Sequence, residues 1–394
     1  MKKNVFLLLL GLFLASTINA QQSLFLDKDI ATVFNESKLD GKPVVVMLYA
    51  TWCAHCNKMK TDTFTQKEVI DYYSSNFHCV AIDGESTLGI EFKQKHQSKF
   101  RVKSFPTFVF FDKDETLLGC ATGEFNKEQF VNEGKFILTP ENQFNAVKKA
   151  FYEDVTNGDK CLKFVTLIKR AGFDPTLITQ KYLNTKTESE LISEYNWKVI
   201  ANGINDIEAK EIAFVTAHKE EYSKVASPAR VERKLLFTAQ DNLQSLVVRL
   251  DTLNYNKKRA IAASFKIRKV DSLVFRYDLT LAEKTKNWKK YTTIANESVE
   301  QFGYKDSNLL VEITSNYLAY IEDKKNLKTA TNWIKQALLL GESLDKYKLA
   351  AQLYLKVNDV KNALELAQKG KNIAVSNGWK TDEMDQLIEQ IKKN

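Results

Sequence analysis

The pattern of apolar and polar residues changes about a third of the way along the chain. Before residue 139, short apolar runs alternate with helical patterns, and the runs at 44–48 and 107–111 are apolar on both faces. Such runs are typical of strands buried inside a sheet. Beyond residue 139 no alternating run is evident, and Leu, Ala, Lys and Glu recur at helical spacing. We therefore predict an α/β domain over residues 21–138 and an all-helical domain over residues 139–394.

The α/β part has a definite order of elements. Helix 30–39 comes first, and helix 56–73 is expected to be irregular near residues 61–65. The expected strands are 44–48, 77–82, 107–111 and 116–121, and the remaining helices are 88–100 and 126–136. After the first helix, the predicted order is therefore β-α-β-α-β-β-α.

The first 20 residues have the pattern of a secretory signal peptide. Lys2 and Lys3 precede an apolar core at 5–14, and small or polar residues lead up to Ala20. This core is shorter than the about 20 apolar residues that a membrane-spanning helix needs. We expect residues 1–20 to be cleaved, the protein to be exported to the periplasm or secreted, and no stable membrane insertion afterwards.

Composition adds two limits. A chain of 394 residues exceeds the size of most single cores, so more than one domain is expected. The net charge of +8 comes from lysines that alternate with glutamates along the later helices, not from one basic block. This pattern predicts a solvated surface and no nucleic-acid partner.

Two cysteines stand where the first buried run gives way to a helical pattern, in Trp52-Cys53-Ala54-His55-Cys56. Their spacing allows a small disulfide or an open dithiol. Cys53 would lie at the helix N-terminus, where the dipole and free N–H groups stabilise a thiolate, so we expect it to be the exposed nucleophile. Cys56, one turn further on, would be the shielded resolving thiol. A protonated His55 would favour the Cys53 thiolate, and Trp52 would shield one side.

Other interpretations of the cysteine pair are open. As a structural staple the pair would be poor, because the loop that it closes is very small. A zinc site needs two further ligands, and the four histidines form no such cluster. A copper-binding thiol pair needs no more than the two cysteines. We favour redox exchange and predict neither a cofactor nor a metal.

A second motif, Phe105-Pro106-Thr107, leads into the apolar run that ends at Phe111. With the Trp-Cys-x-x-Cys motif, it makes the chain resemble the thioredoxin superfamily over residues 23–135. The resemblance implies a cis Pro106 facing the dithiol, substrate contact at Phe105 and Pro106, protein thiol or disulfide substrates, and an upstream redox partner. Cys-x-His-Cys is similar to the more oxidising members, such as protein disulfide isomerases. Met47 stands where many thioredoxins have a buried acid, which puts general reduction in doubt.

The chain has five cysteines, so three remain once Cys53 and Cys56 are set aside. Cys79 lies in an apolar run and is expected to be an inert core thiol. Cys120 and Cys161 could pair with each other or stay free.

The helical part contains weak signs of a repeat. Three prolines follow capping residues, at Thr139-Pro140, Asp174-Pro175 and Ser227-Pro228, and each pair predicts a helix start. Tyr320 and Tyr354 stand in similar surroundings, and the region 275–394 resembles tetratricopeptide repeats, which stack helix pairs into protein-binding surfaces. A generic helical bundle is the alternative.

Together, the patterns predict an exported protein disulfide oxidoreductase that acts through Cys53 and Cys56, with a helical domain for client or partner binding. The alternative is a non-catalytic interaction scaffold in which the dithiol is structural or handles a metal.

Overall fold

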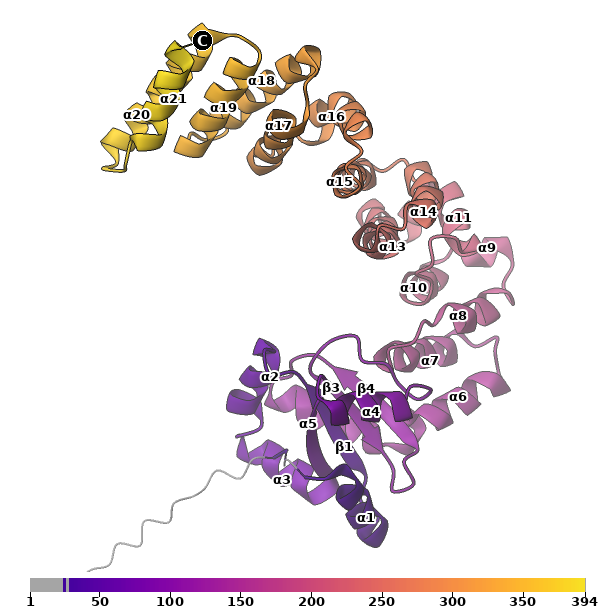
Figure 1. The fold of residues 1–394 in the computed structure, drawn as a ribbon. Helices are drawn as coiled ribbons and strands as arrows, with labels where there is room; N and C mark the ends of the chain where they lie inside the picture. The colour runs from indigo at the N-terminus through magenta and orange to yellow at the C-terminus, as the bar shows by residue number, and fades with distance from the viewer. Residues whose placement is uncertain (1–23, 26–27, 394) are drawn as a thin grey trace, which may run out of the picture. The chain divides into compact units, whose positions relative to one another are not determined.

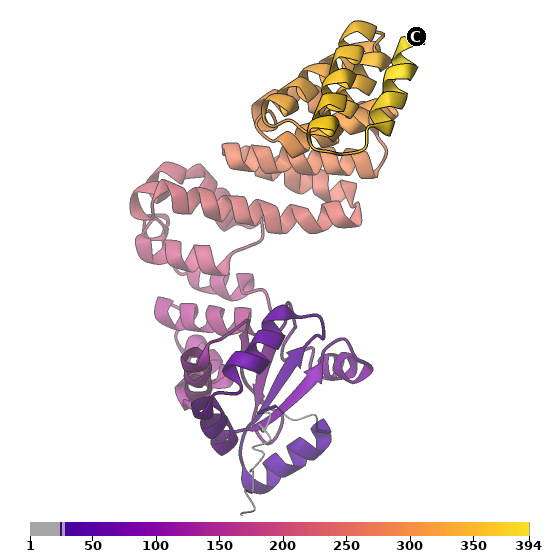
Figure 2. The same ribbon diagram turned by 90° about the vertical axis from the view of Figure 1, so that its left-hand side faces the viewer.

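The computed structural model describes residues 24–25 and 28–393, so the predicted signal peptide lies outside the described residues. The chain divides into two compact units, Met1–Ile204 and Asn205–Asn394. The first unit contains a mixed sheet and its helices, and the second is helical (Figures 1 and 2). Each unit is considered by itself below.

The sheet has four strands in the order β2-β1-β3-β4. They are β1 (Val44–Tyr49), β2 (His78–Asp83), β3 (Thr107–Phe111) and β4 (Leu117–Thr122). β1 is parallel to β2 and antiparallel to β3, and β3 is antiparallel to β4. The four predicted strands and their order along the chain are confirmed.

Helices cover both faces of the sheet because the strands are apolar on both faces. One face packs against α1 (Ile30–Asp40) and α4 (Thr87–Lys95), whose Phe34 and Phe92 lie beside Val46 of β1. The other face packs against three helical elements, namely α2 (Ala54–Lys58), α3 (Lys67–Asn76) and α5 (Lys127–Leu138). Successive residues of β1 alternate between the two cores: Val45 and Met47 belong to the second.

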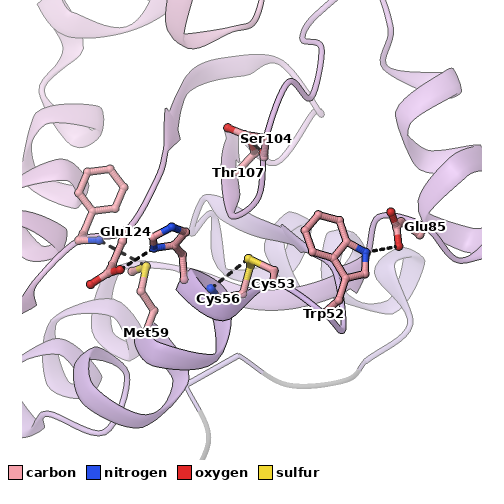
Figure 3. The surroundings of a disulfide bond; sticks show 10 residues. Trp52, Cys53, Cys56, Met59, Glu85, Ser104, Thr107 and Glu124 are labelled. Carbon is pink, nitrogen blue, oxygen red and sulfur yellow. Dashed lines mark hydrogen bonds and ion pairs between the residues drawn. A yellow bond between two sulfur atoms is a disulfide. The ribbon is translucent and has the colours of Figure 1, made fainter. Parts of the chain in front are cut away.

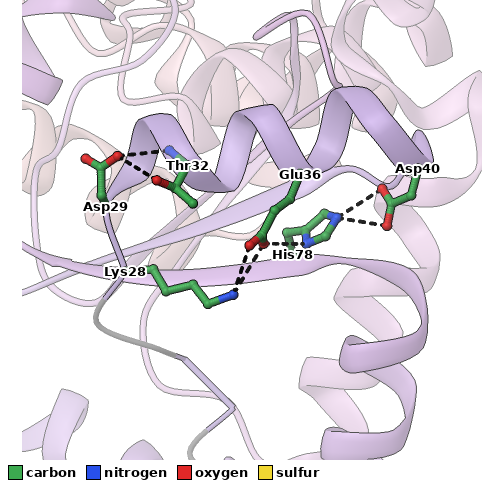
Figure 4. Close-up of polar contacts among 6 residues, drawn as sticks. All are labelled: Lys28, Asp29, Thr32, Glu36, Asp40 and His78. Carbon is green, nitrogen blue, oxygen red and sulfur yellow. Dashed lines mark hydrogen bonds and ion pairs between the residues drawn. The ribbon is translucent and has the colours of Figure 1, made fainter.

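The irregularity expected near residues 61–65 is a π-helical turn, η1 (Met59–Thr63), that separates α2 from α3. Figure 4 shows how α1 is held at both ends. The Asp29 carboxylate accepts a hydrogen bond from the Thr32 N–H at 2.9 Å. At the far end, His78 of β2 lies 3.0 Å from Asp40, and this contact lowers the pKa of the Asp40 carboxyl.

The first unit continues past the sheet. It includes η2 (Pro140–Asn142), α6 (Phe144–Glu153), α7 (Gly158–Arg170), α8 (Thr176–Leu183), α9 (Glu188–Leu191) and α10 (Glu194–Gly203). Ala171, just after α7, is buried in the core on the α1 side of the sheet. Its carbonyl accepts a hydrogen bond from the Arg101 N–H at 2.8 Å. The polarity change at residue 139 therefore falls inside a compact unit, and our domain boundary stays a prediction.

The second unit is built of consecutive helix pairs. After α11 (Lys210–Ala217) and α12 (Lys219–Val225), the pairs are α13 (Pro228–Arg249) with α14 (Thr252–Ser264), α15 (Arg268–Lys284) with α16 (Trp288–Phe302), α17 (Ser307–Tyr320) with α18 (Lys324–Leu339), and α19 (Leu344–Lys356) with α20 (Val360–Ser376). The chain ends with α21 (Asp382–Lys392). Figure 1 shows α17 to α21 packed side by side. Ser227 and Pro228 open α13, and Pro140 opens η2, as predicted.

A regular interval underlies these pairs. The second helix of each pair is capped by the side chain of Asp251, Asn287, Asp323 or Asp359, which accepts the N–H three residues further on. The interval is 36 residues at each step, from 251 to 287, to 323 and to 359. Our alignment of Tyr320 with Tyr354 is wrong, because Tyr320 ends α17 and is 54% exposed whereas Tyr354 is buried within α19. The buried tyrosine of α17 is Tyr317, one turn before Tyr320.

Among the helices that the structure describes, none combines the length and the apolar character required to cross a bilayer.

Candidate active site at the Cys53–Cys56 disulfide

The two cysteines lie where β1 leads into α2, and they form a disulfide with their Cα atoms 5.3 Å apart (Figure 3). Cys53 is the N-cap residue of α2, and its Sγ accepts a hydrogen bond from the Cys56 N–H at 3.1 Å. This N–H and the positive end of the helix both favour negative charge on the Cys53 sulfur. The local geometry is therefore the one that the sequence predicts.

Cys56 is shielded, as predicted, but the exposure of Cys53 differs from our expectation. Cys53 is 4% exposed, so the prediction of an openly exposed side chain is wrong for this disulfide form. Cys53 nevertheless lines a groove of about 660 Å³, whereas Cys56 is 0% exposed and lies in the core behind it. An incoming sulfur would thus meet Cys53 before Cys56, which is the order required of an attacking and a resolving thiol.

Trp52 and Phe105 both line this groove, which we call the dithiol groove. Trp52 is 70% exposed, its indole N–H donates to Glu85 at 2.8 Å, and its ring lies edge-on to Phe105 with centroids 6.2 Å apart. The Phe105–Pro106 peptide bond is cis, as the family resemblance implies. Pro106 itself is buried. An exposed Trp52 packed against a half-buried Phe105 places apolar surface beside the disulfide.

His55 is paired with a carboxylate that the sequence analysis missed. Its Nδ1 lies 2.8 Å from Glu124, which also contacts Lys58 at 2.5 Å. Lys58 and His55 lower the pKa of Glu124, and Glu124 raises the pKa of Lys58. When His55 is protonated, the three side chains carry one net positive charge. The field that His55 exerts on Cys53 is therefore partly offset by Glu124 and supplemented by Lys58.

Glu124 and Glu85 lie 69 and 33 residues away in sequence from the side chains that they contact, His55 and Trp52. Each stands just after a strand, at the edge of the sheet where β1 delivers the cysteines. An acidic residue directly after a strand was the signal that could have pointed to them.

The surroundings of Cys56 are apolar. Met47, Ala50 and Met59 belong to the same buried cluster, and Met47 is fully buried. The place where many thioredoxins have an acid is thus occupied by a thioether that accepts no proton. Among the described residues, no group of three or more His, Cys, Asp or Glu side chains is arranged to hold a metal ion.

The other three cysteines are free thiols, so the alternative of a Cys120–Cys161 disulfide does not apply. Cys120 and Cys161 are buried and Cys79 is half-buried. Burial raises the pKa of Cys79 and Cys120, and it raises the pKa of Cys161 to about 12. These thiols stay protonated at neutral pH, in contrast to the setting of Cys53.

The sheet order, the flanking helices and a disulfide at the start of α2, directly after β1, define a thioredoxin-like domain. A family model described as a thioredoxin-like domain matches residues 30–137. Thioredoxin-1 of Drosophila melanogaster is 31% identical over 88 residues, which are 22% of this chain and 74% of that protein. The chain belongs to the thioredoxin family through this N-terminal domain.

Two further similarities cover the same domain. The chloroplastic thioredoxin-like protein HCF164 of Oryza sativa subsp. japonica is 28% identical over 102 residues, which are 26% of this chain and 36% of that protein. The chain thus spans about a third of the length of this relative. The solved structure of the DsbH oxidoreductase is 22% identical, with a TM-score of 0.26, and the match covers 32% of this chain and 94% of that one.

Proposed function

We propose that this chain is an exported thiol–disulfide oxidoreductase that exchanges disulfides with protein substrates through Cys53 and Cys56. The observation that carries the proposal is the position of the disulfide. Cys53 borders the dithiol groove at the start of a helix, and Cys56 lies behind it in the core. A purely structural role is a poor alternative, because a disulfide that closes so small a loop adds little to the stability of the fold.

In the reducing direction, the Cys53 thiolate attacks one sulfur of a substrate disulfide, and the other substrate sulfur leaves as a thiolate that takes up a proton. The Cys56 thiol then loses its proton to water, and its thiolate attacks the Cys53 sulfur of the mixed disulfide. The substrate sulfur that was bonded to Cys53 leaves as a thiolate and takes up a proton, and the Cys53–Cys56 disulfide forms. Two electrons pass to the substrate, so each further cycle needs an external dithiol as reductant. The oxidising direction runs through the same steps in reverse.

The neighbouring side chains have supporting roles in this proposal. Trp52 and Phe105 would contact the substrate on either side of the disulfide, and Pro106 would hold Phe105 at the groove. His55 would act on Cys53 by its charge, together with Lys58 and against Glu124.

The proposal includes export and a role for the helices. Export is supported by the signal-like sequence at residues 1–20. The tetratricopeptide-like interpretation is supported by helix pairs at a constant interval, an architecture that builds extended protein-binding surfaces. We infer that the second unit binds clients or an upstream redox partner.

Reduction of insulin disulfides by dithiothreitol, followed by turbidity, is the direct test. The wild-type protein and a Cys79→Ser control should accelerate the reaction, whereas Cys53→Ser should leave it at the rate of dithiothreitol alone. Cys56→Ser should accumulate mixed disulfides on Cys53. Equal acceleration by wild-type protein and Cys53→Ser would end the proposal.

A second candidate is a non-catalytic scaffold, and the 36-residue array of helix pairs favours it. Under this hypothesis, the full-length Cys53→Ser/Cys56→Ser variant captures the same proteins from its own cell extract as the wild type does. Loss of all partners in that variant would contradict the scaffold and favour the oxidoreductase.

A further inference from the structure

A second hollow lies next to the dithiol groove, within the first unit. It has a volume of about 340 Å³ and lies between the end of α7 and the segment that precedes β3. Arg101, Lys103, Lys169, Arg170 and Glu133 contribute its charged groups, and we call it the basic pocket. Lys103 lines both hollows, so the basic pocket adjoins the groove at Cys53.

The two hollows share a wall made by residues 101–105. Arg101 and Lys103 line the basic pocket, while Val102, Ser104 and Phe105 line the dithiol groove with Lys103. Figure 3 shows Ser104 on the side of the groove opposite the disulfide. From residue 101 to residue 104 the side chains line the two hollows in turn, except that Lys103 lines both, and the chain bends from Ser104 onward. A peptide that crosses this segment at Lys103, the residue common to both linings, would pass from one hollow to the other.

The charges along this path are predominantly positive. Within the described residues, Lys93, Lys103 and Lys169 form no ion pair, and the Arg101 guanidinium lies 5.3 Å from the centre of the Phe173 ring instead of a carboxylate. Arg170 is paired with Glu133 through two contacts, at 2.8 and 3.3 Å. Five cations against Glu133 and Glu85 leave a net charge of +3 along the two linings. Isolated surface lysines are usually just solvated, but here they converge on a hollow beside a reactive disulfide.

The pocket depends on the part of the chain that follows the family match. Lys169 and Arg170 end α7, beyond the match at residues 30–137. Gly172 has φ +79°, and a Cβ added there would lie 2.0 Å from the Arg101 carbonyl oxygen. With the Arg101–Ala171 hydrogen bond, this close approach holds the end of α7 against residue 101. The helices after the sheet thus add a feature to the dithiol groove that the matched domain does not supply by itself.

We propose that the basic pocket binds acidic side chains that flank the reactive disulfide of a protein client. The client disulfide would lie at Cys53, and carboxylates a few residues away would lie beside Lys103 and Lys169. Because an extended chain advances about 3.3 Å per residue, adjoining hollows are within reach of one short segment. The inference rests on the proposed function and names the client class of the same site.

The test uses the full chain and three synthetic peptides of equal length. Each has one internal disulfide, flanked by Asp and Glu, by Ser and Asn, or by Lys. We expect kcat/KM to rank acidic above neutral above basic, with about a fivefold gap between acidic and neutral peptides at low ionic strength. The gap should close at about 1 M salt, where the screening length is about 3 Å. A docking role predicts that the gap lies mainly in KM.

The Lys103→Gln/Lys169→Gln variant should bring the ratio of acidic to neutral kcat/KM close to 1. The control Lys38→Gln/Lys135→Gln removes the same charge from exposed lysines that line neither hollow, and it should keep the wild-type ratio. Wild-type protein that turns over all three peptides equally would overturn the inference even if the variant failed to fold. Failure to reduce both the neutral peptide and the uncharged 2-hydroxyethyl disulfide would instead overturn the proposed function.

Discussion

His96 should make the stability of the first unit depend on pH between about 6.5 and 4. It follows α4 and is 1% exposed, and its ring lies 4.7 Å from Phe92 and 5.0 Å from Phe111, centroid to centroid. Neither ring nitrogen has a hydrogen-bond partner among the described residues, and Nε2 lies 3.5 Å from an oxygen of the Glu115 carboxylate. Burial, together with the charges of Lys99 and Lys95 and against that of Glu115, lowers the pKa of His96 to about 4.

The sign follows from where the proton binds. Between the ordinary value of about 6.5 and the folded value of about 4, the unfolded chain is protonated at His96 and the folded chain is not. The free energy of unfolding is therefore unaffected above pH 6.5 and falls as the pH drops towards 4. The difference between the unfolded and folded pKa values of His96 corresponds to about 3 kcal/mol, which is a large part of a domain's stability.

Hydrogen exchange of the β1 and β3 amides reports on the opening of this unit in the full-length protein. We expect their protection, corrected for intrinsic exchange, to fall by about 3 kcal/mol between pH 6.5 and 4. In His96→Phe, which keeps an aromatic ring but cannot take up a proton, most of this slope should vanish. An unchanged slope in His96→Phe would refute the reasoning and assign the pH dependence to other groups.

Three further predictions concern the rest of the chain. Asp323→Ala and Asp359→Ala each remove an N-cap of the 36-residue interval and should each lower the unfolding free energy of the second unit by about 1 kcal/mol in urea, while the exposed Lys361→Ala should change it little. Gly89→Ala should cost about 3 kcal/mol or prevent folding, because the new Cβ would lie 2.0 Å from the Asp83 carbonyl oxygen, and exposed Leu88→Ala in the same helix is the control. In reduced native protein, iodoacetamide should modify Cys53, at the N-terminus of α2, well before Cys79, Cys120 and Cys161, whose pKa values are raised, as mass spectrometry of the modified peptides would show; equal rates for all the cysteines would contradict this difference in thiolate stability.

The sheet was accessible to sequence reasoning because burial on both faces leaves continuous apolar runs. Val44 to Leu48 and Thr107 to Phe111 could hardly be anything but central strands, and the cysteine pair stands at the end of the first. Of the site, the sequence could predict only the residues that are neighbours along the chain. Glu124 and Glu85 reach His55 and Trp52 across loops, and no local pattern encodes such distant pairing.

In the helical part, a local signal was present but was sought in the wrong residues. Aromatic residues suggested a spacing between Tyr320 and Tyr354, but the regular signal is carried by the capping residues from Asp251 to Asp359. A large side chain occupies whichever helix position faces enough space, so its position differs from one helix pair to the next. A cap is bound to the first turn by its own hydrogen bond, and it keeps its place.

The four capped helices begin at a constant interval along the chain, but the side chains that they bury differ in size. The residue four positions after each cap is fully or almost fully buried, and its identity runs Tyr255, Tyr291, Leu327 and Ala363 along the chain. Deleting one 36-residue block would keep the remaining helix starts at the same interval. It would also bring into contact helices whose buried side chains differ in volume. The modules are thus uniform in length without being interchangeable, and placing a tyrosine module where Leu327 or Ala363 now packs would create a clash, whereas the reverse exchange would leave a void.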